Sequence, residues 1–253
     1  MISKANLAWP FRIIYVSYAV LWFVLLMLLI FPFIFIASLW GRIKGGNFIY
    51  HILRIWSAVW FFLVGIRHKN IYQTKPDPKK QYIFVINHRS NLDAAILVET
   101  IRQPFRPLGK VEISKVPVFG FIYRTVVVMV DRNDAGNRAK SLRNLKSVLK
   151  KGISIMIFPE GTFNETDQPL KSFYDGAFRI AIETQTQIQP VLFLDSFKRF
   201  KYHHLFSLNP GPSRSLFLDP IPVDGLTLAD AKSLKERVFT IMEENLVSFE
   251  ALR

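Results

Sequence analysis

Residues 13 to 40 form an apolar run without a single charged side chain. As one helix this run would be roughly 42 Å long at about 1.5 Å per residue. The hydrocarbon core of a bilayer is about 30 Å thick and takes about 20 residues to span. The run is therefore long enough for one tilted span, or for a helix broken at Pro32. A signal peptide fits less well, because its apolar region has roughly 7–15 residues.

A second apolar stretch, residues 48–66, follows closely and is interrupted only by His51 and Arg54. The first acidic residue of the chain is Asp77, and basic residues flank the first apolar run on both sides. The positive-inside rule then gives no single orientation for one span. We predict a membrane-associated two-helix hairpin whose ends both stay on the cytoplasmic, anionic side. Two full spans and a buried helix of a soluble protein are the alternatives.

Residues 74–80 are polar and contain two prolines, which indicates a linker. Beyond it, short apolar runs typical of strands alternate with helical patterns. We expect an α/β fold with a mostly parallel sheet flanked by helices. The sequence thus predicts two parts, N-terminal membrane-anchoring helices (1–73) and an α/β domain (74–253). The expected strands are 81–86, 126–130, 153–158, 190–194 and 214–218, and the expected helices are 134–151, 173–183 and 227–246.

The net charge of +14 suits anionic partners, namely nucleic acid, an anionic membrane surface or acidic substrates. A nucleic-acid partner is not expected, because the aromatic residues concentrate in the apolar N-terminus rather than among basic patches. The cluster of Lys198, Arg199 and Lys201 suits anionic lipid headgroups or an acidic carrier protein, or is a solvated surface. The chain has no cysteine. Adjacent His203 and His204 have poor ligand spacing, so no metal is expected.

His88 directly follows the first expected strand, and Asp93 lies five residues later. A tight turn would bring the Asp93 carboxylate to one ring nitrogen of His88 and leave the other nitrogen facing a substrate. An alcohol needs such a base to attack a carbonyl. The chain has no Gly-x-Ser-x-Gly nucleophile elbow, so the attacking hydroxyl would belong to the substrate. On spacing alone, the bland interpretation of a structural His–Asp pair comes first, and the catalytic interpretation depends on the further blocks described next.

Two further blocks lie at the ends of expected strands, where an open α/β sheet binds ligands. Glu160, Gly161 and Thr162 follow the third strand, where a carboxylate and backbone amides suit a polar acceptor. Lys110 precedes the second strand and Arg132 follows it. Both cations suit a phosphate group, although each alone also reads as a solvated surface charge.

Together, in this order and spacing, these blocks resemble the glycerophospholipid acyltransferase family, whose typical member is 1-acyl-sn-glycerol-3-phosphate acyltransferase. The resemblance covers about residues 80–195. It implies that His88 is the general base and that Asp93 orients it. It also implies that Glu160, Gly161 and Thr162 help to bind the acceptor. The acyl donor would be a thioester of coenzyme A or acyl carrier protein, with no other cofactor and no metal.

Two positions depart from the family pattern. Many bacterial members have an arginine after Glu-Gly-Thr, where this chain has Phe163, and a later Phe-Lys-x-Gly block here has Tyr174 in place of the lysine. Fewer cations would hold a phosphate. The expected function is a membrane-bound O-acyltransferase acting on a lysolipid hydroxyl, at the cytoplasmic face of the inner membrane if bacterial. Lysophosphatidic acid is the first acceptor considered, and a lyso-amino-acid lipid competes with it. A hydrolase and a non-catalytic membrane scaffold are remoter alternatives.

Overall fold

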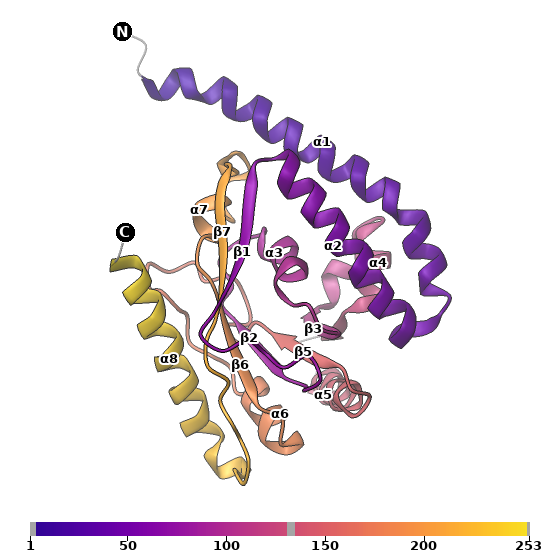
Figure 1. Cartoon of the computed structure of the whole chain (residues 1–253), viewed down its shortest axis with the longest axis vertical. Coiled ribbons are helices and arrows are strands. Elements are labelled where there is room, and N and C mark those ends of the chain that lie inside the picture. The colour runs from indigo at the N-terminus through magenta and orange to yellow at the C-terminus, as the bar shows by residue number, and fades with distance from the viewer. Residues whose placement is uncertain (1–3, 131–134, 252–253) are drawn as a thin grey trace.

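A seven-stranded sheet forms the centre of the molecule in the computed structural model, which describes residues 4–130 and 135–251 (Figure 1). Its strand order is β1-β7-β6-β2-β5-β3-β4, and every pairing is parallel except that between β6 and β7. The strands are β1 (Ile66–Tyr72), β2 (Ile83–Ile86), β3 (Phe105–Lys110), β4 (Val128–Val130), β5 (Ser154–Ile157), β6 (Ile188–Phe193) and β7 (Gly211–Phe217).

Helices cover both faces of the sheet (Figure 1). The apolar residues of α1 to α4 pack on one face, and those of α5, α6 and α8 pack on the other. This arrangement confirms the predicted α/β class with a mostly parallel sheet flanked by helices. The helices are α1 (Lys4–Ser38), α2 (Gly46–Leu63), α3 (Asp93–Thr100), α4 (Phe119–Val126), α5 (Ala135–Lys150), α6 (Gly176–Thr184), α7 (Ser196–Arg199) and α8 (Ala231–Ala251).

Strand β2 shows why an unbroken apolar run belongs at the centre of such a sheet. All four of its residues are buried. Successive side chains of a strand point to opposite faces. Phe84 and Ile86 accordingly join the core beneath α2 and α3, whereas Ile83 and Val85 join the core beneath α6 and α8. The expected strands 81–86, 153–158, 190–194 and 214–218 are confirmed as β2, β5, β6 and β7. Of the expected strand 126–130, only Val128–Val130 forms a strand, β4, because Val126 is the last residue of α4.

The long apolar helix α1 runs without interruption through Pro32, so the break considered at that residue does not occur. Among the described residues it is the only helix long and apolar enough to cross a membrane, over Trp9–Ser38. A short π-helical turn at Gly41–Gly45 leads into α2, which returns along α1 (Figure 1). The buried side chain of Arg106 in β3 donates to the carbonyl of Arg42 in this turn at 2.7 Å and so ties it to the sheet.

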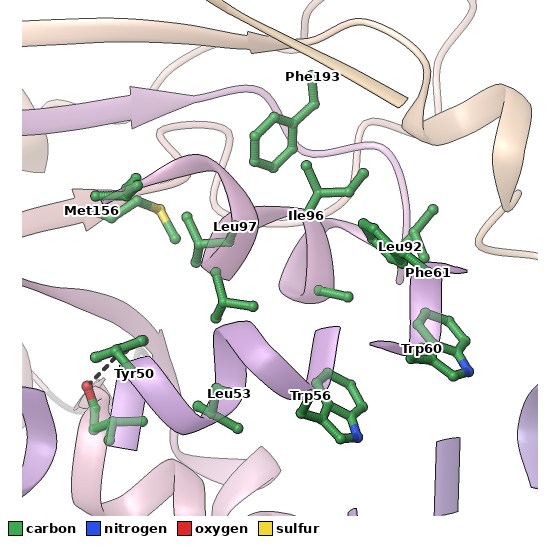
Figure 2. Close-up of a cluster of buried hydrophobic side chains, with 14 of the residues drawn as sticks. Tyr50, Leu53, Trp56, Trp60, Phe61, Leu92, Ile96, Leu97, Met156 and Phe193 are labelled. Carbon is green, nitrogen blue, oxygen red and sulfur yellow. Dashed lines mark hydrogen bonds between the residues drawn. The ribbon is translucent and has the colours of Figure 1, made fainter. Parts of the chain in front are cut away.

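Helix α2 belongs to the core of the α/β fold as much as to the pair that it forms with α1 (Figure 2). Its buried face carries two tryptophans, Trp56 and Trp60, beside aliphatic and aromatic neighbours, and it meets Leu92, Ile96 and Leu97 at α3. The predicted two-helix arrangement therefore differs from the structure in one respect. Its second helix packs onto α3, and only the first has the length and apolarity of a membrane span.

Two strands lie where no strand is expected from the sequence. Strand β1 contains mainly polar residues, yet it pairs in parallel with β7 at one edge of the sheet. Strand β3 contains Pro107 and Gly109, which are unfavourable in strands, yet it pairs with β4 and β5. The predicted division of the chain at residues 73 and 74 separates β1 from the sheet to which it belongs.

Candidate active site

The turn between β2 and α3 brings His88 and Asp93 into direct contact at the carboxyl end of β2. The Asp93 carboxylate accepts a hydrogen bond from Nδ1 of His88 at 2.8 Å through Oδ2. The same oxygen accepts the backbone N–H groups of Arg89 and Ser90, both at 2.9 Å. A carboxylate can only accept, so Nδ1 carries the proton and Nε2 of the neutral ring is an acceptor. Nε2 can therefore take a proton from a substrate hydroxyl.

Short polar side chains close this turn on itself. The hydroxyl of Ser90 accepts the N–H of Leu92 at 3.0 Å and donates to the carbonyl of Phe200 at 2.5 Å. The amide of Asn87 pairs with the backbone of Phe193 in both directions, at 3.2 and 2.7 Å, and so fixes the end of β2 to β6. The backbone position of His88 is consequently fixed by the hydrogen bonds of Asn87 before it and of Ser90 after it.

Exposure differs sharply within the pair. The Asp93 side chain is fully buried, whereas the His88 side chain is 20% exposed. The imidazole stacks on Phe158, with ring centroids 3.9 Å apart and planes 9° apart. It also contacts Phe163 at 4.2 Å, and Phe163 in turn stacks on Tyr202. The ring is therefore held between aromatic walls and offers only part of its edge to a substrate.

Glu160 lies fully buried beside His88, at the end of β5. One carboxylate oxygen accepts the backbone N–H of His88 at 2.7 Å, and the other accepts that of Lys171 at 3.0 Å. Burial raises the pKa of Glu160 to about 7, and the two backbone hydrogen bonds oppose that rise. This placement differs from the expected contact with an acceptor, because both oxygens point to backbone. Glu160 instead positions the backbone of His88.

Gly161 and Thr162 form the turn that follows Glu160. Gly161 has a φ of +74°, a left-handed conformation that favours glycine, and its N–H donates to the carbonyl of Phe158 at 3.1 Å. The hydroxyl of Thr162 accepts the ammonium of Lys171 at 2.9 Å. Lys171 was not predicted as a site residue, because its distance from the Glu-Gly-Thr block in the sequence gives no sign of this contact.

The two cations expected to bind phosphate have different outcomes. Lys110 is the exposed last residue of β3. Because β2, β5 and β3 are parallel, the carboxyl end of β3 lies at the same edge of the sheet as His88 and Glu160. Arg132 lies outside the described residues.

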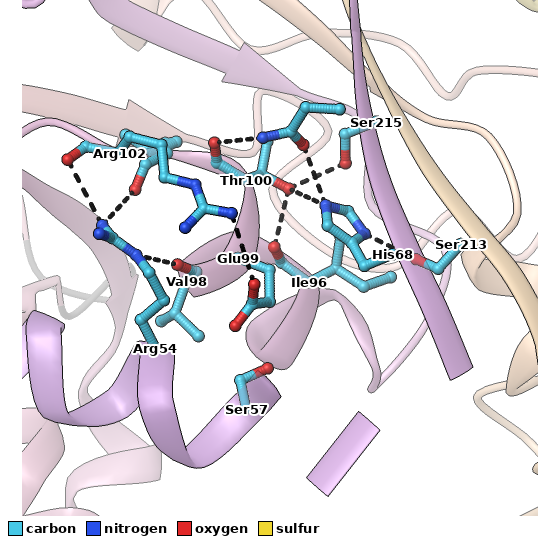
Figure 3. A network of polar contacts seen from close by, with 12 residues as sticks. Arg54, Ser57, His68, Ile96, Val98, Glu99, Thr100, Arg102, Ser213 and Ser215 are labelled. Carbon is cyan, nitrogen blue, oxygen red and sulfur yellow. Dashed lines mark hydrogen bonds and ion pairs between the residues drawn. The ribbon is translucent and has the colours of Figure 1, made fainter. Parts of the chain in front are cut away.

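Side chains of α2 donate hydrogen bonds to the backbone of α3, the helix that begins with Asp93 (Figure 3). The guanidinium of Arg54 donates to the carbonyls of Val98 at 3.3 Å and Ile101 at 3.1 Å, where the helix ends. A cation is favourable at that end because the terminal carbonyls carry partial negative charge. The hydroxyl of Ser57 donates to Ala95 near the other end at 3.0 Å. Because Asp93 begins α3, the position of the His88–Asp93 pair depends on α2.

A buried polar cluster holds α3 from the opposite side (Figure 3). The hydroxyl of Thr100 is 2.8 Å from that of Ser215 in β7. His68 in β1 lies between Ser213 and Asn70, at 3.1 and 2.9 Å from their side chains. Burial lowers the pKa of His68 to about 4, so this ring is neutral at pH 7. His68 is therefore a structural histidine that joins β1 to the sheet and to α3.

The chain belongs to the acyltransferase family, whose family model matches residues 65–194. This result confirms the resemblance to glycerophospholipid acyltransferases. An uncharacterised acyltransferase of Schizosaccharomyces pombe is 31% identical over 182 residues, which are 68% of this chain and 62% of that protein. The human 1-acyl-sn-glycerol-3-phosphate acyltransferase alpha is 28% identical over 189 residues, which are 74% of this chain and 66% of that protein. The chain thus spans slightly less than two thirds of these relatives.

A solved structure shares the whole architecture. The crystal structure of the 1-acyl-sn-glycerophosphate acyltransferase PlsC from Thermotoga maritima superposes with a TM-score of 0.75. The superposition covers 95% of this chain and 98% of that one, at 19% sequence identity. At this identity the likeness establishes the fold alone.

Proposed function

We propose that the protein is a membrane-bound O-acyltransferase that converts 1-acyl-sn-glycerol-3-phosphate to phosphatidic acid in phospholipid biosynthesis. The observation that carries this proposal is the 2.8 Å contact between His88 and Asp93, with a partly exposed imidazole at the ligand-binding edge of the sheet. The family of the chain supports the reaction type, and the named human relative supports the acceptor.

The reaction needs one base and no nucleophile from the protein. Nε2 of His88 takes the proton of the acceptor hydroxyl while the oxygen forms a bond to the thioester carbonyl carbon. The tetrahedral intermediate then collapses, the carbon–sulfur bond breaks, and the imidazolium returns the proton to the leaving thiolate. Asp93 holds the ring in the required tautomer and stabilises the imidazolium between these two steps. The products are a diacyl lipid and a free thiol.

Lys171 offers a cation where the family arginine is absent. Its ammonium lies on the hydroxyl of Thr162, one residue before Phe163. Lys110 lies at the end of the neighbouring strand of the same sheet edge. We assign these two cations to the phosphate of the acceptor, because phosphate is held by ammonium donors as well as by guanidinium groups. In this proposal Thr162 and Gly161 border the acceptor, and Glu160 acts through the backbone of His88.

The membrane and the acyl donor complete the proposal. The outward side of α1 exposes large apolar residues along its length, for example Ile14, Leu21, Leu29 and Phe33, which suits insertion into lipid. The lysolipid acceptor would then reach the site from the membrane. The donor is an acyl thioester of coenzyme A or acyl carrier protein, and a bacterial chain would act at the cytoplasmic face of the inner membrane.

An acceptor screen tests this function. Purified full-length protein in mixed detergent–phosphatidylcholine micelles is given a labelled acyl thioester and, separately, lysophosphatidic acid, a lyso-amino-acid lipid, monoacylglycerol or buffer. We expect labelled phosphatidic acid and one free thiol per acyl group transferred. Faster acylation of the lyso-amino-acid lipid would transfer the proposal to that acceptor, for which the missing cation at Phe163 argues. Thioester loss without a lipid product would identify a hydrolase instead.

Lys171 gives a sharper test of the acceptor. Lys171→Gln should raise the KM for lysophosphatidic acid about tenfold, because it removes a charge-assisted contact to phosphate. The matched control is Lys151→Gln, an exposed lysine after α5. An unchanged KM in Lys171→Gln would remove this residue from the acceptor site.

A further inference from the structure

A groove with a basic end lies between the start of α1 and the segment 198–210. It encloses about 770 Å³ and is lined by one cation from α1, Arg12, and by two from the segment, Lys198 and Lys201. Trp9 lines the same groove at the end of the apolar span, where tryptophan marks the boundary between lipid and water. The groove therefore lies where headgroups of a bilayer would meet the protein.

The groove continues along α1 as an apolar trough of about 510 Å³. The two parts share Leu205 and Phe206 as lining residues. Among the described residues, the rest of its lining comes from α1, for example Val20, Leu21 and Val24, and includes no charged residue. One end of the groove thus suits an anion, and the other suits a hydrocarbon chain.

We propose that this groove binds one anionic glycerophospholipid, with its phosphate at Arg12, Lys198 and Lys201 and one acyl chain along Leu21 and Val24. Ammonium and guanidinium groups near a membrane surface attract anionic lipid, and an apolar trough gains by covering a chain. An acidic protein would use the cations and leave the trough empty. Inorganic phosphate would do the same. A groove that is basic at one end and apolar at the other therefore favours a whole lipid.

The groove shares a wall with the candidate active site. Segment 198–210 includes Phe200, whose carbonyl accepts the hydroxyl of Ser90 beside His88. It also includes Tyr202, whose ring stacks on Phe163 at 5.5 Å. A lipid in the groove would contact the same segment that holds Ser90 and Phe163 beside His88. This inference goes beyond the proposed function, because it holds for any acceptor and for any reaction at His88.

Binding of phosphatidylglycerol, an anionic lipid whose sn-1 and sn-2 hydroxyls are both already acylated, tests the site. The full chain carrying His88→Ala, which prevents turnover, is titrated in dodecylmaltoside micelles with labelled phosphatidylglycerol or labelled phosphatidylcholine. We expect saturable binding of one phosphatidylglycerol per chain and at least tenfold weaker binding of phosphatidylcholine. The variant Arg12→Gln/Lys198→Gln/Lys201→Gln should bind phosphatidylglycerol at least tenfold more weakly.

A charge-matched control separates the groove from the general basicity of the chain. Lys150→Gln/Lys151→Gln/Arg237→Gln removes the same charge from exposed positions on the opposite face of the sheet, and should bind as the unsubstituted chain does. Equal loss of binding in both variants would overturn the proposal. Full displacement of the lipid by millimolar inorganic phosphate, or by an acidic acyl carrier protein, would also overturn it.

The trough has its own pair of variants on one helix. Leu21→Gln/Val24→Gln changes two exposed residues that line it, whereas Leu25→Gln/Leu29→Gln changes two exposed residues of α1 that do not. We expect weaker phosphatidylglycerol binding only in the first pair, by about tenfold or more because each glutamine places a polar group against the acyl chain. Indistinguishable affinities of the two pairs would exclude a chain seated along α1.

Discussion

Replacing Asp93 by asparagine isolates the charge of this residue from its shape. In the native turn, one oxygen of Asp93 accepts three hydrogen bonds, from the His88 ring and from the N–H groups of Arg89 and Ser90. The amide oxygen of asparagine can take that place and accept all three. The flipped amide would put its NH₂ group against two backbone donors, which is unfavourable. The variant should therefore keep both the fold and the histidine tautomer.

The loss expected in Asp93→Asn follows from the removed charge. The imidazolium formed during the reaction would lie about 4 Å from the carboxylate charge, and at an effective dielectric constant of about 20 their attraction is about 4 kcal/mol. Because each 1.36 kcal/mol is about tenfold in rate, kcat should fall about 10³-fold. The burial of Asp93 supports using a dielectric constant well below that of water.

The assay is phosphatidic acid formation from lysophosphatidic acid and an acyl thioester, beside thermal unfolding in detergent. Asp93→Asn should lose activity and keep its unfolding temperature within a few degrees. Asp93→Ala should lose both, since it leaves the backbone donors of Arg89 and Ser90 without their acceptor. A loss of less than tenfold in Asp93→Asn would refute the reasoning, because the carboxylate would then have no part in stabilising charge on His88.

Three further predictions follow from the surroundings of the pair. Burial raises the pKa of Glu160 from 4.5 to about 7. Between these two pH values the folded state holds a proton that the unfolded state has released. The free energy of unfolding should therefore fall by about 3 kcal/mol as the pH rises from 4.5 to 7. Glu160→Gln cannot titrate, so the pH dependence of its thermal unfolding should be flatter, and an identical pH dependence would exclude the assignment. Phe163→Arg should lower the KM for lysophosphatidic acid about tenfold and leave that for monoacylglycerol unchanged; a parallel change in both would mean that no phosphate lies beside this position. Arg54→Met should lower the free energy of unfolding by about 2 kcal/mol, because the last carbonyls of α3 lose a charged donor, whereas exposed Arg67→Met should change it little; equal unfolding temperatures would show that α2 does not hold α3 through this contact.

Features with a local physical cause could be predicted from the sequence. Strand β2 is a short apolar run that is buried on both sides, and such a run has few other places in a fold. The contact of His88 with Asp93 also follows locally, since a turn of a few residues brings the two side chains together. The sequence order of these elements was enough to place the pair at the edge of the sheet.

Features that depend on distant partners could not be predicted in this way. Strand β1 is polar and acquires its place only by pairing with β7, far along the chain. The sequence predicts Glu160 as an acceptor-binding carboxylate. In the fold its oxygens accept the backbone N–H groups of His88 and Lys171, which are far from it in the sequence. The apolarity of α2 suggested a lipid-facing helix, whereas packing on α3 uses the same apolar surface. Apolarity alone does not distinguish lipid from protein core.

The role of His88 as the general base is the central claim, and His88→Ala tests it most directly. Single-turnover transfer of a labelled acyl group to lysophosphatidic acid would be measured with full-length protein, alongside thermal unfolding and flotation with phosphatidylcholine vesicles. Loss of a general base should slow the transfer by at least about 10²-fold while unfolding and flotation stay unchanged. Transfer at the unsubstituted rate by a folded, membrane-attached His88→Ala protein would contradict the account.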